Sequence, residues 1–346
     1  MKINLVIVLS LLVLMFFSIS TIFSIGKTDA FVKSIIIWTI AFLILFSSLY
    51  IKYSTIFRYP HFQIFYFLTI IFLILLFVLP SKERMWFSIG GFAIQPSEFS
   101  RILILTTLTI FLSKYFNYLK NNLFLLLSFL VIFPFWSLVI LQPDFGMGLL
   151  IFLTWFFSVI IFLNWRQIFL LILIFSLLGI FSWHYVLKDY QKERILTFIN
   201  PDRDPLKAGY NIRQLKITVG SAGFWGKGFG KGTQAKLGFL PSAETDFILA
   251  SLIEERGFLG FLIYSFLIFL IIRTILFESQ FIKDSLGQVF SNLLAIHFGI
   301  KFLLTTSINL GFFPIIGLAV PFLSYGGSHL ISDFILLAIW HNFRNN

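Results

Sequence analysis

Four short clusters of polar residues interrupt a sequence that is otherwise strongly apolar. Each lies at the end of a long apolar run, and together they are Gln95-Pro96-Ser97-Glu98, Gln142-Pro143-Asp144, the stretch 241–246 and the stretch 324–328. Carboxylates, amides and hydroxyls of this kind can transfer protons and bind polar ligands. If the apolar runs place all four clusters on one side of the protein, we expect them to form a single site.

Asp246 is the strongest candidate for a catalytic group. It lies where a basic segment meets an apolar run. Partial burial at such a junction weakens the hydration of a carboxylate and raises its pKa, which suits a general base. The alternative interpretation is that Asp246 only caps a helix, which is a common role for Asp at a helix start.

Glu98 and Arg101 form a second candidate group. They are three residues apart, so they share one face of a helix. Charged residues within apolar segments are unfavourable unless paired, and they commonly mark functional sites. We therefore expect this pair to shape a polar cavity, and the alternative is an ion pair that only holds helices together.

The elements that position these residues follow from the composition. Hydrophobic residues make up 58% of the 346 residues and charged residues 12%, whereas soluble domains average about 45–50% and about 25%. The mean hydropathy is +0.95. These values exclude a water-soluble enzyme. The absence of cysteine excludes disulfides, thiolate metal sites and a cysteine nucleophile.

Ten apolar runs approach the ~20 residues that a helix needs to span a bilayer. They are 4–24, 33–51, 62–80, 98–115, 123–141, 146–163, 168–187, 247–272, 287–306 and 327–343. The pattern predicts an all-α polytopic integral membrane protein with one domain, 1–346, and a retained first helix rather than a cleaved signal peptide. The stretch 307–326 is apolar but broken by Gly311, Pro314, Gly317 and Pro321, which favours a re-entrant or interfacial segment lining protein or a cavity.

The distribution of Lys and Arg predicts the sidedness. Ten spans put both termini on one side, and the short segments on that side carry nine Lys and Arg residues, against four on the other side. The positive-inside rule therefore predicts cytoplasmic termini in the cytoplasmic membrane. All four polar clusters then face outward, so we expect an extracytoplasmic site. The net charge of +11 is explained by this rule and by an anionic lipid substrate, without nucleic acid.

A large polar segment, 188–246, separates the seventh and eighth spans and is predicted to be an extracytoplasmic loop. It carries ten Lys and Arg and six Asp and Glu residues. Its glycine-rich stretch 223–232 fits neither nucleotide-binding template. Backbone N–H groups and cations there could still bind a diphosphate, and the candidates are Arg213, Lys216, Lys227 and Lys231. The histidines show no metal-binding spacing, although a divalent cation could assist at a diphosphate.

The clusters, in this order, resemble the SEDS family (shape, elongation, division and sporulation proteins). The matching stretches are Arg84-Met85-Trp86, Gln95–Glu98, 142–146, 209–214, 223–234, 240–247 and 321–328. The resemblance runs from about residue 80 to the last residue. It favours the elongation-type RodA branch over the division-type FtsW branch, because the segment before the first span is short.

The resemblance implies a peptidoglycan glycosyltransferase that polymerises lipid II outside the cytoplasmic membrane, for cell elongation and shape. It implies a class B penicillin-binding protein, a transpeptidase, as partner, with membrane lipids around the chain. The family's essential Asp corresponds to Asp246, and its polar pair corresponds to Glu98 and Arg101. One departure is Glu244, which stands where the family usually has His.

The remaining members of the clusters are candidates for binding substrate or lining the cavity. They are Gln95, Asp144, Thr245, Ser324 and Tyr325. Two other functions compete with the polymerase. A flippase for lipid-linked precursors would explain charges within the spans, but it would need polar motifs on the inner side as well. A scaffold whose outer loop only binds partners would leave those charges unexplained.

Overall fold

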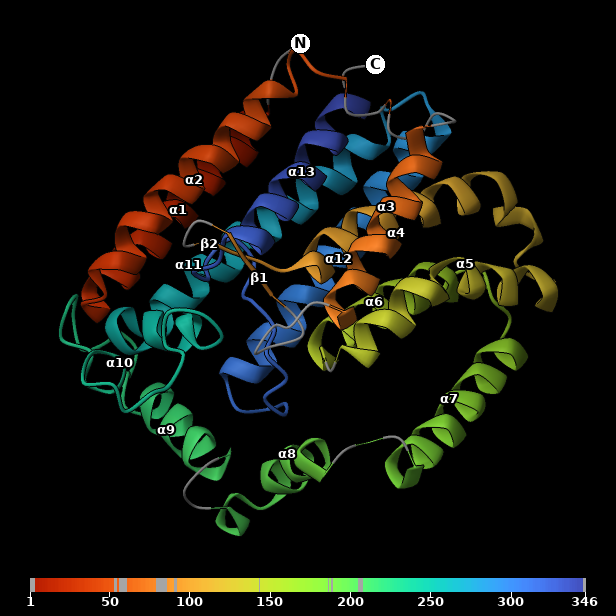
Figure 1. Ribbon diagram of the computed structural model, residues 1–346. Helices are drawn as coiled ribbons and strands as arrows, with labels where there is room; N and C mark the ends of the chain where they lie inside the picture. Colours follow the sequence, from red (N-terminus) through yellow and green to blue (C-terminus); the bar gives the residue numbers. More distant parts are fainter. Residues whose placement is uncertain are drawn as a thin grey trace.

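The apolar runs fold into helices, which satisfy their own backbone hydrogen bonds where lipid offers no partner. The structure is a computed structural model, and it describes residues 4–52, 55, 61–78, 86–89, 92–142, 144–185, 187, 189–204 and 208–344. The helices pack side by side, and α1 begins at the same end of the molecule at which α13 ends (Figure 1).

Thirteen α-helices and two strands make up the described elements, together with 3₁₀ turns at Phe116–Tyr118 and Pro201–Arg203. The helices are α1 (Leu5–Ile25), α2 (Thr28–Ser47), α3 (His61–Val78), α4 (Pro96–Tyr115), α5 (Asn122–Leu141), α6 (Phe145–Ile160), α7 (Trp165–Tyr185), α8 (Asp189–Ile199), α9 (Ala208–Gly220), α10 (Thr233–Lys236), α11 (Ile248–Ser279), α12 (Ser285–Asn309) and α13 (Gly327–Arg344). The strands are β1 (Phe87–Ile89) and β2 (Phe92–Ile94).

Each of the ten expected spans overlaps one long helix, namely α1–α7 and α11–α13. By length and composition alone, six of the described helices could cross a membrane: α1, α2, α5, α7, α11 and α12. Helices α4 and α13 are less apolar because they bury charged and polar side chains, and α6 has only 16 residues. The count of ten crossings therefore stays a prediction.

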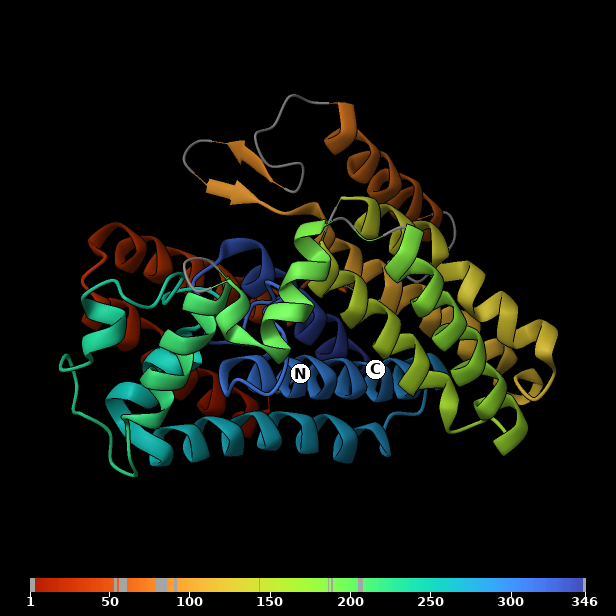
Figure 2. The same ribbon diagram turned by 90° about the horizontal axis from the view of Figure 1, so that it is seen from below.

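The two strands are a feature that the all-α expectation lacked. They pair antiparallel with Phe87 opposite Ile94, immediately before α4. Figure 2 shows the pair standing off the helical body. The sequence between the strands is Gly90-Gly91, a dipeptide that favours tight hairpin connections. The protein remains predominantly helical.

Helix α12 lies at the centre of the helical body, where it packs against α4, α6, α11 and α13. On one side, α13 packs on α2, and α1 packs on α11. Aromatic rings fill the space between these elements: the Phe298 and Phe322 centroids are 5.2 Å apart, and Trp38 meets Phe334 edge-on at 5.6 Å. Large apolar side chains remain exposed along most helices, as expected for a protein that faces lipid.

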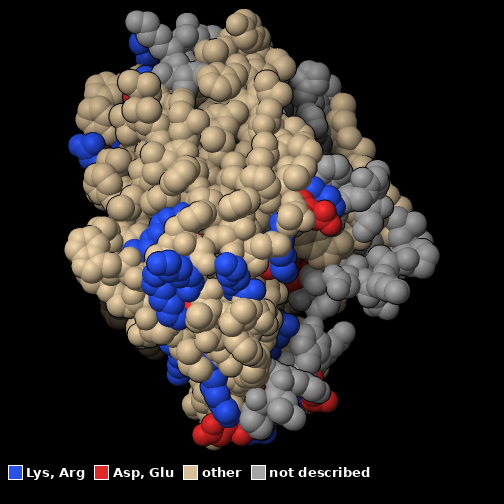
Figure 3. Space-filling view, turned by 90° about the vertical axis from the view of Figure 1, so that its left-hand side faces the viewer, with Lys and Arg blue, Asp and Glu red and all other residues tan. Residues whose placement is uncertain are grey.

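The segment 188–246, predicted to be a loop, contains helices α8, α9 and α10. Lys188 and residues 205–207 lie outside the described residues. Figure 3 shows Lys and Arg side chains gathered on the face of the molecule that this segment adjoins. The exposed cations of the segment include Arg213, Lys216, Lys231 and Lys236. The side of the membrane on which the segment lies stays a prediction.

A glycine-rich turn after α9 folds tightly against α11. The backbone N–H of Lys227 donates to the Glu254 carbonyl at 2.9 Å. At the crossing point Gly226 and Gly257 both adopt positive φ, 80° and 67°, and Gly257 interrupts the helical geometry of α11. A Cβ on Gly226 would lie 2.4 Å from the Gly257 nitrogen, and a Cβ on Gly257 would lie 2.3 Å from the Gly226 nitrogen. Only glycine allows the two backbones to approach so closely.

After α12 the chain runs without regular helix from Leu310 to Gly326, as the Gly and Pro residues of this stretch predict. Much of it is buried, including Leu318, Val320 and Leu323. Irregular backbone at this depth must find partners within the protein. Accordingly, the Val320 N–H donates to Ser324 Oγ at 2.7 Å, and the Leu323 carbonyl accepts a bond from Ser18 Oγ at 2.7 Å.

Candidate active site

The four polar clusters converge on one cavity of about 350 Å³. Each lies at the start of a helix: α4, α6, α11 or α13. The lining residues are Trp86, Gln95, Glu98, Asp144, Phe145, Met147, Arg194, Thr245, Asp246, Ile316, Gly317, Ala319, Tyr325, Gly326, Ser328 and His329. Six of the twelve candidate residues therefore line the cavity, and two more, Arg101 and Ser324, adjoin it. The matched-motif residues Arg84, Met85 and Pro143 lie outside the described residues.

Asp246 lies half-buried in the wall of this cavity, and its backbone position is fixed. Asn309 Nδ2 donates to the Asp246 carbonyl at 2.9 Å, while Asn309 Oδ1 accepts from the Ala250 N–H at 3.1 Å. Among the residues that the structure describes, none donates a hydrogen bond to the Asp246 carboxylate. Burial raises the pKa of this carboxyl, although the nearby Arg194 opposes the rise. The cavity therefore contains a carboxylate that is available to accept a proton.

Asp144, unlike Asp246, has a carboxylate whose oxygens already accept hydrogen bonds from the protein. Its Oδ2 accepts hydrogen bonds from Gln95 Nε2 at 2.7 Å and from Ser97 Oγ at 2.9 Å. Its Oδ1 caps α6 by accepting from the Met147 N–H at 3.1 Å. Burial raises the pKa of the Asp144 carboxyl to about 6, while these bonds favour the charged form. Asp144 thus joins the starts of α4 and α6, and its oxygens are already occupied.

Glu98 and Arg101 face each other on α4 and are almost completely buried. Glu98 lines the floor of the cavity, and its carboxylate pairs with the Arg101 guanidinium. Arg101 Nη1 also contacts Asp333 Oδ1 on α13 at 2.7 Å. The ion pair joins a cavity wall to a deeper network, and a functional role for the pair stays a prediction.

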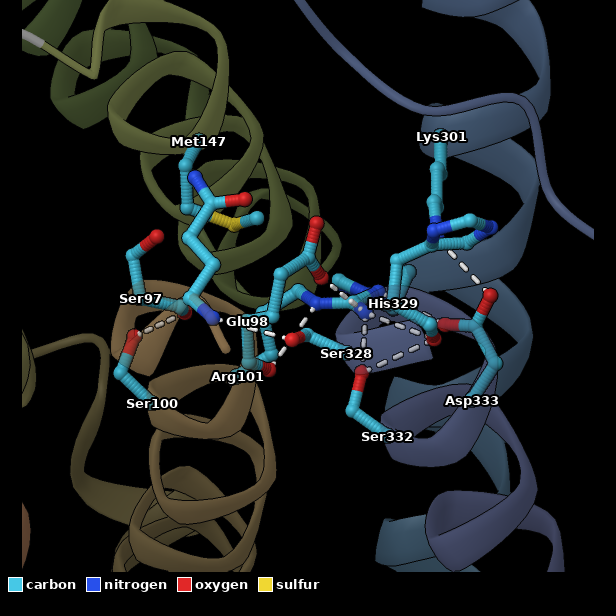
Figure 4. A network of polar contacts seen from close by, with 12 residues as sticks. Ser97, Glu98, Ser100, Arg101, Met147, Lys301, Ser328, His329, Ser332 and Asp333 are labelled. Atoms are coloured by element: carbon cyan, nitrogen blue, oxygen red, sulfur yellow. Dashed lines mark hydrogen bonds and ion pairs between the residues drawn. The ribbon is translucent and has the colours of Figure 1, made fainter. Parts of the chain in front are cut away.

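The deeper network adds Lys301 and Asp333, which Figure 4 shows beside Arg101, and the histidine His297. Lys301 Nζ on α12 contacts Asp333 Oδ2 at 2.8 Å, and His297 Nε2 lies 3.3 Å from Arg101 Nη1. His297 Nδ1 lies 3.1 Å from Thr154 Oγ1 on α6. The network therefore connects α4, α6, α12 and α13 beneath the cavity, with two cations balanced by two carboxylates. These residues stand inside expected spans, and their charge in an apolar run was a signal that could have identified them.

The cluster before α13 holds the cluster before α11 in place. Ser324 Oγ donates to the Thr245 carbonyl at 2.7 Å, and the Tyr325 N–H donates to the Glu244 carbonyl at 2.9 Å. The side chain of Glu244 forms an ion pair with Lys27, which precedes α2. Glu244 does not belong to the described lining of the cavity. Ser324 and Tyr325 therefore position the segment that carries Asp246.

None of the four proposed diphosphate-binding cations is among the described lining residues of the cavity, so their part in binding a diphosphate stays a prediction. Lys227 Nζ pairs with Glu254 Oε1 at 2.7 Å, because the glycine-rich turn folds against α11. Arg213 pairs with Asp202 at 2.8 Å, and neither Lys216 nor Lys231 is part of the lining. The cation that lines the cavity is Arg194, on α8.

His329 is a lining residue that the sequence analysis missed. It is 4% exposed, and its Nε2 has no hydrogen-bond partner among the described residues. Its ring bonds to the Ser324 backbone, so the bond uses Nδ1 and leaves Nε2 as a buried acceptor. No group of three or more described His, Asp and Glu residues is placed to hold a metal ion. The site thus offers a base, a cation and an unpaired acceptor.

Comparison with known proteins gives a consistent result. The model of the family FTSW_RODA_SPOVE, described as "Cell cycle protein", matches residues 1–346. The "Peptidoglycan glycosyltransferase MrdB" of Escherichia coli (strain K12) is 34% identical over 249 residues, which cover 71% of this chain and 66% of that protein. The "Probable peptidoglycan glycosyltransferase FtsW" of Wigglesworthia glossinidia brevipalpis is 37% identical over 264 residues, covering 73% and 67%. Because both groups match similarly, the RodA-type preference stays a prediction.

Solved structures share the fold. A chain described under "Structural coordination of polymerization and crosslinking by a peptidoglycan synthase complex" is 23% identical, with a TM-score of 0.82, and the match covers 98% of this chain and 97% of that one. The crystal structure of the Thermus thermophilus rod shape determining protein RodA is 20% identical, with a TM-score of 0.67 and coverage of 98% and 95%. The alignment with MrdB spans slightly less than two thirds of that relative's length.

Proposed function

Because the chain belongs to the FtsW, RodA and SpoVE family of cell cycle proteins, we propose that it is a peptidoglycan glycosyltransferase that polymerises lipid II. The observation that carries the proposal is the Asp246 carboxylate, which faces the cavity without a hydrogen bond from any described residue. Glu98 and Asp144 share the cavity, but each is committed to partners. Asp246 is therefore the carboxylate best suited to act as a base.

The proposed reaction is an inverting glycosyl transfer. Asp246 removes the proton from a hydroxyl of the acceptor sugar as that oxygen attacks the anomeric carbon of the donor. A bond forms between the acceptor oxygen and the anomeric carbon, and the bond to the lipid diphosphate breaks. The donor supplies its own energy in the sugar–diphosphate bond, so ATP is not required. A cation beside the departing diphosphate would stabilise its charge, and Arg194 lines the cavity for this role.

Binding of the substrate would use the remaining groups of the wall. His329 Nε2 can accept a hydrogen bond from a sugar hydroxyl or amide, because it has no described partner in the protein. Gly317 lies beside Asp246 and leaves room there, since a Cβ on it would come within 3.8 Å of Asp246 Oδ2. The network of Arg101, Lys301 and Asp333 would hold the floor of the cavity rigid.

The protein is a multi-pass membrane protein, with helices long and apolar enough to span a bilayer and with relatives of the same family. We propose further that it lies in the bacterial cytoplasmic membrane with both termini in the cytoplasm and the cavity outside. A class B penicillin-binding protein would then cross-link the new strands. The relative described as part of a peptidoglycan synthase complex supports such a partner.

The decisive variant is Asp246→Asn, which keeps the size of the side chain but cannot take up the proton. General-base catalysis contributes about 10²–10⁴-fold, so glycan formation from lipid II should fall by that factor. Asp246→Glu should retain part of the activity, and Asp202→Asn, an exposed carboxylate on another segment, should retain all of it. The assay uses purified protein, labelled lipid II and the transpeptidase partner, with thermal unfolding as a check on folding.

Two outcomes would contradict the proposal. Near-normal polymer from Asp246→Asn would leave Asp246 as a structural residue only. Translocation of a labelled lipid-linked precursor across vesicles, without any polymer from the wild-type protein, would favour the flippase instead.

A further inference from the structure

A second cavity, of about 710 Å³, lies between α5, α6 and α7 and shares no described lining residue with the candidate active site. Most of its wall is apolar. The apolar lining residues are Leu125, Leu126, Phe129, Trp155, Leu170, Leu171, Ile174, Phe175 and Leu178. The volume is in the range of pockets that hold a small molecule, about 300–1,000 Å³.

The cavity exists because α7 is attached to the rest of the protein at two places. At its start, Gln167 Nε2 donates to the Lys120 carbonyl and to Asn122 Oδ1, each at 2.9 Å. Two turns further on, the Phe175 ring packs on Phe152, with centroids 4.5 Å apart. About 12 Å of helix separates Gln167 from Phe175, and the space beside this stretch is not filled by protein. Figures 1 and 2 both show α7 at the edge of the molecule.

One end of the cavity is polar and positively charged. It is formed by Lys120, Asn122, Asn164, Arg166 and Gln167. No Asp or Glu belongs to its described lining, and no described carboxylate forms an ion pair with Lys120 or Arg166. The corner is held in shape, because the Gln167 N–H donates to Asn164 Oδ1 at 3.0 Å and Gln167 Oε1 accepts from the Asn164 N–H at 3.2 Å.

We propose that this cavity binds an anionic phospholipid. One acyl chain fills the apolar space between α5, α6 and α7, and the phosphate-bearing headgroup pairs with Lys120 and Arg166. An apolar cavity beside a lipid-facing helix offers water no hydrogen-bond partners, so a lipid chain is its natural occupant. The two cations without a lining carboxylate select a headgroup with net negative charge over a zwitterionic one. The bound lipid holds α7 against the helical body.

The headgroup contact is tested by native mass spectrometry of the purified protein, titrated with phosphatidylglycerol or phosphatidylcholine. The wild-type protein should retain phosphatidylglycerol preferentially. The double variant Lys120→Gln/Arg166→Gln should bind it roughly 30-fold more weakly, from about 1 kcal/mol per cation. The control Arg273→Gln/Lys283→Gln removes the same charge from exposed sites outside the cavity and should bind as the wild type does. Equal retention of both lipids by the wild type, or equal weakening by both double variants, would overturn the proposal.

The chain contact is tested by filling the cavity. Leu171→Trp replaces a lining side chain with a larger, aromatic one, whereas Leu173→Trp makes the same change at an exposed residue outside the cavity. Only Leu171→Trp should lose the retained phosphatidylglycerol, and retention by both variants would contradict the proposed chain site. If Leu171→Trp does not fold, the charge variants decide the question. Binding is measured without glycosyl transfer, so its outcome is independent of the proposed function.

Discussion

Replacing Glu98 and Lys301, separately and together, tests whether the buried network is balanced as a unit. Arg101 and Lys301 are opposed by Glu98 and Asp333, and each of the four side chains is at most 5% exposed. Glu98→Gln leaves two cations against one carboxylate, and Lys301→Met leaves one cation against two carboxylates. Both substitutions nearly preserve volume, so the change in charge dominates. The double variant restores neutrality and keeps the contact between Arg101 and Asp333.

The magnitudes follow from burial. Removing one partner of a buried ion pair costs about 3–5 kcal/mol, because the other charge is left without compensation. If the two effects were independent, the double variant would lose about 6–10 kcal/mol of the free energy of unfolding. We expect it to lose only about as much as one single variant. With ~2.1 cal/mol/K of unfolding entropy per residue, each single variant should lower Tm by about 4–7 °C.

The assay is thermal unfolding of the purified protein in one detergent at one pH. Two substitutions at separate exposed residues, Asp202→Asn and Lys231→Met, serve as controls. Each should change Tm by no more than about 1 °C. If the fall in Tm for Glu98→Gln/Lys301→Met equals the sum of the two single falls, the charges act independently. That result would refute the reasoning about a balanced network.

Three further predictions concern the cavity and the topology. Burial raises the pKa of Asp246 and Arg194 opposes the rise, so polymerisation should fall as the pH drops through this pKa. Arg194→Gln should shift that fall to higher pH, and an unshifted pH profile would contradict the role of Asp246 as the base. His329→Phe removes the unpaired Nε2 and the ring's bond to the Ser324 backbone, so it should raise KM for lipid II and lower Tm by only about 1–4 °C. A normal KM would exclude His329 from binding. An impermeant thiol reagent should label Lys236→Cys in intact cells but Lys283→Cys only after permeabilisation, since the chain has no native cysteine; labelling of Lys283→Cys in intact cells would overturn the predicted sidedness.

The long helices could be predicted because each is a run of apolar residues whose length matches a bilayer. The cavity could be predicted for a related reason. Runs of alternating direction bring every second junction to the same end, so Glu98, Asp144, Asp246 and Tyr325 meet although they are far apart in the sequence. The hairpin at Phe87–Ile94 was missed because three-residue strands carry too little periodicity to stand out beside apolar helices.

The partners of individual charges could not be predicted. Arg101 contacts Asp333 across 232 positions, and no spacing rule relates residues on two separate helices. Lys227 looked available because it lies in a basic, glycine-rich stretch, but the turn folds back and places it on Glu254. Sequence reasoning identifies which residues carry charge, whereas tertiary packing decides which of them remain free.

The crossing of Gly226 and Gly257 limits how the sequence can evolve. Any substitution at either position adds at least a Cβ, which would meet the opposite backbone at 2.2–2.4 Å. A clash between two side chains can be relieved by shrinking the partner, but here the partner is already glycine, so no second-site replacement can compensate. Lipid-facing positions can exchange Phe, Leu and Ile with little consequence. Genetic drift can therefore change most residues of the outer surface. At Gly226 and Gly257, by contrast, every single substitution produces a clash, so both positions must stay glycine.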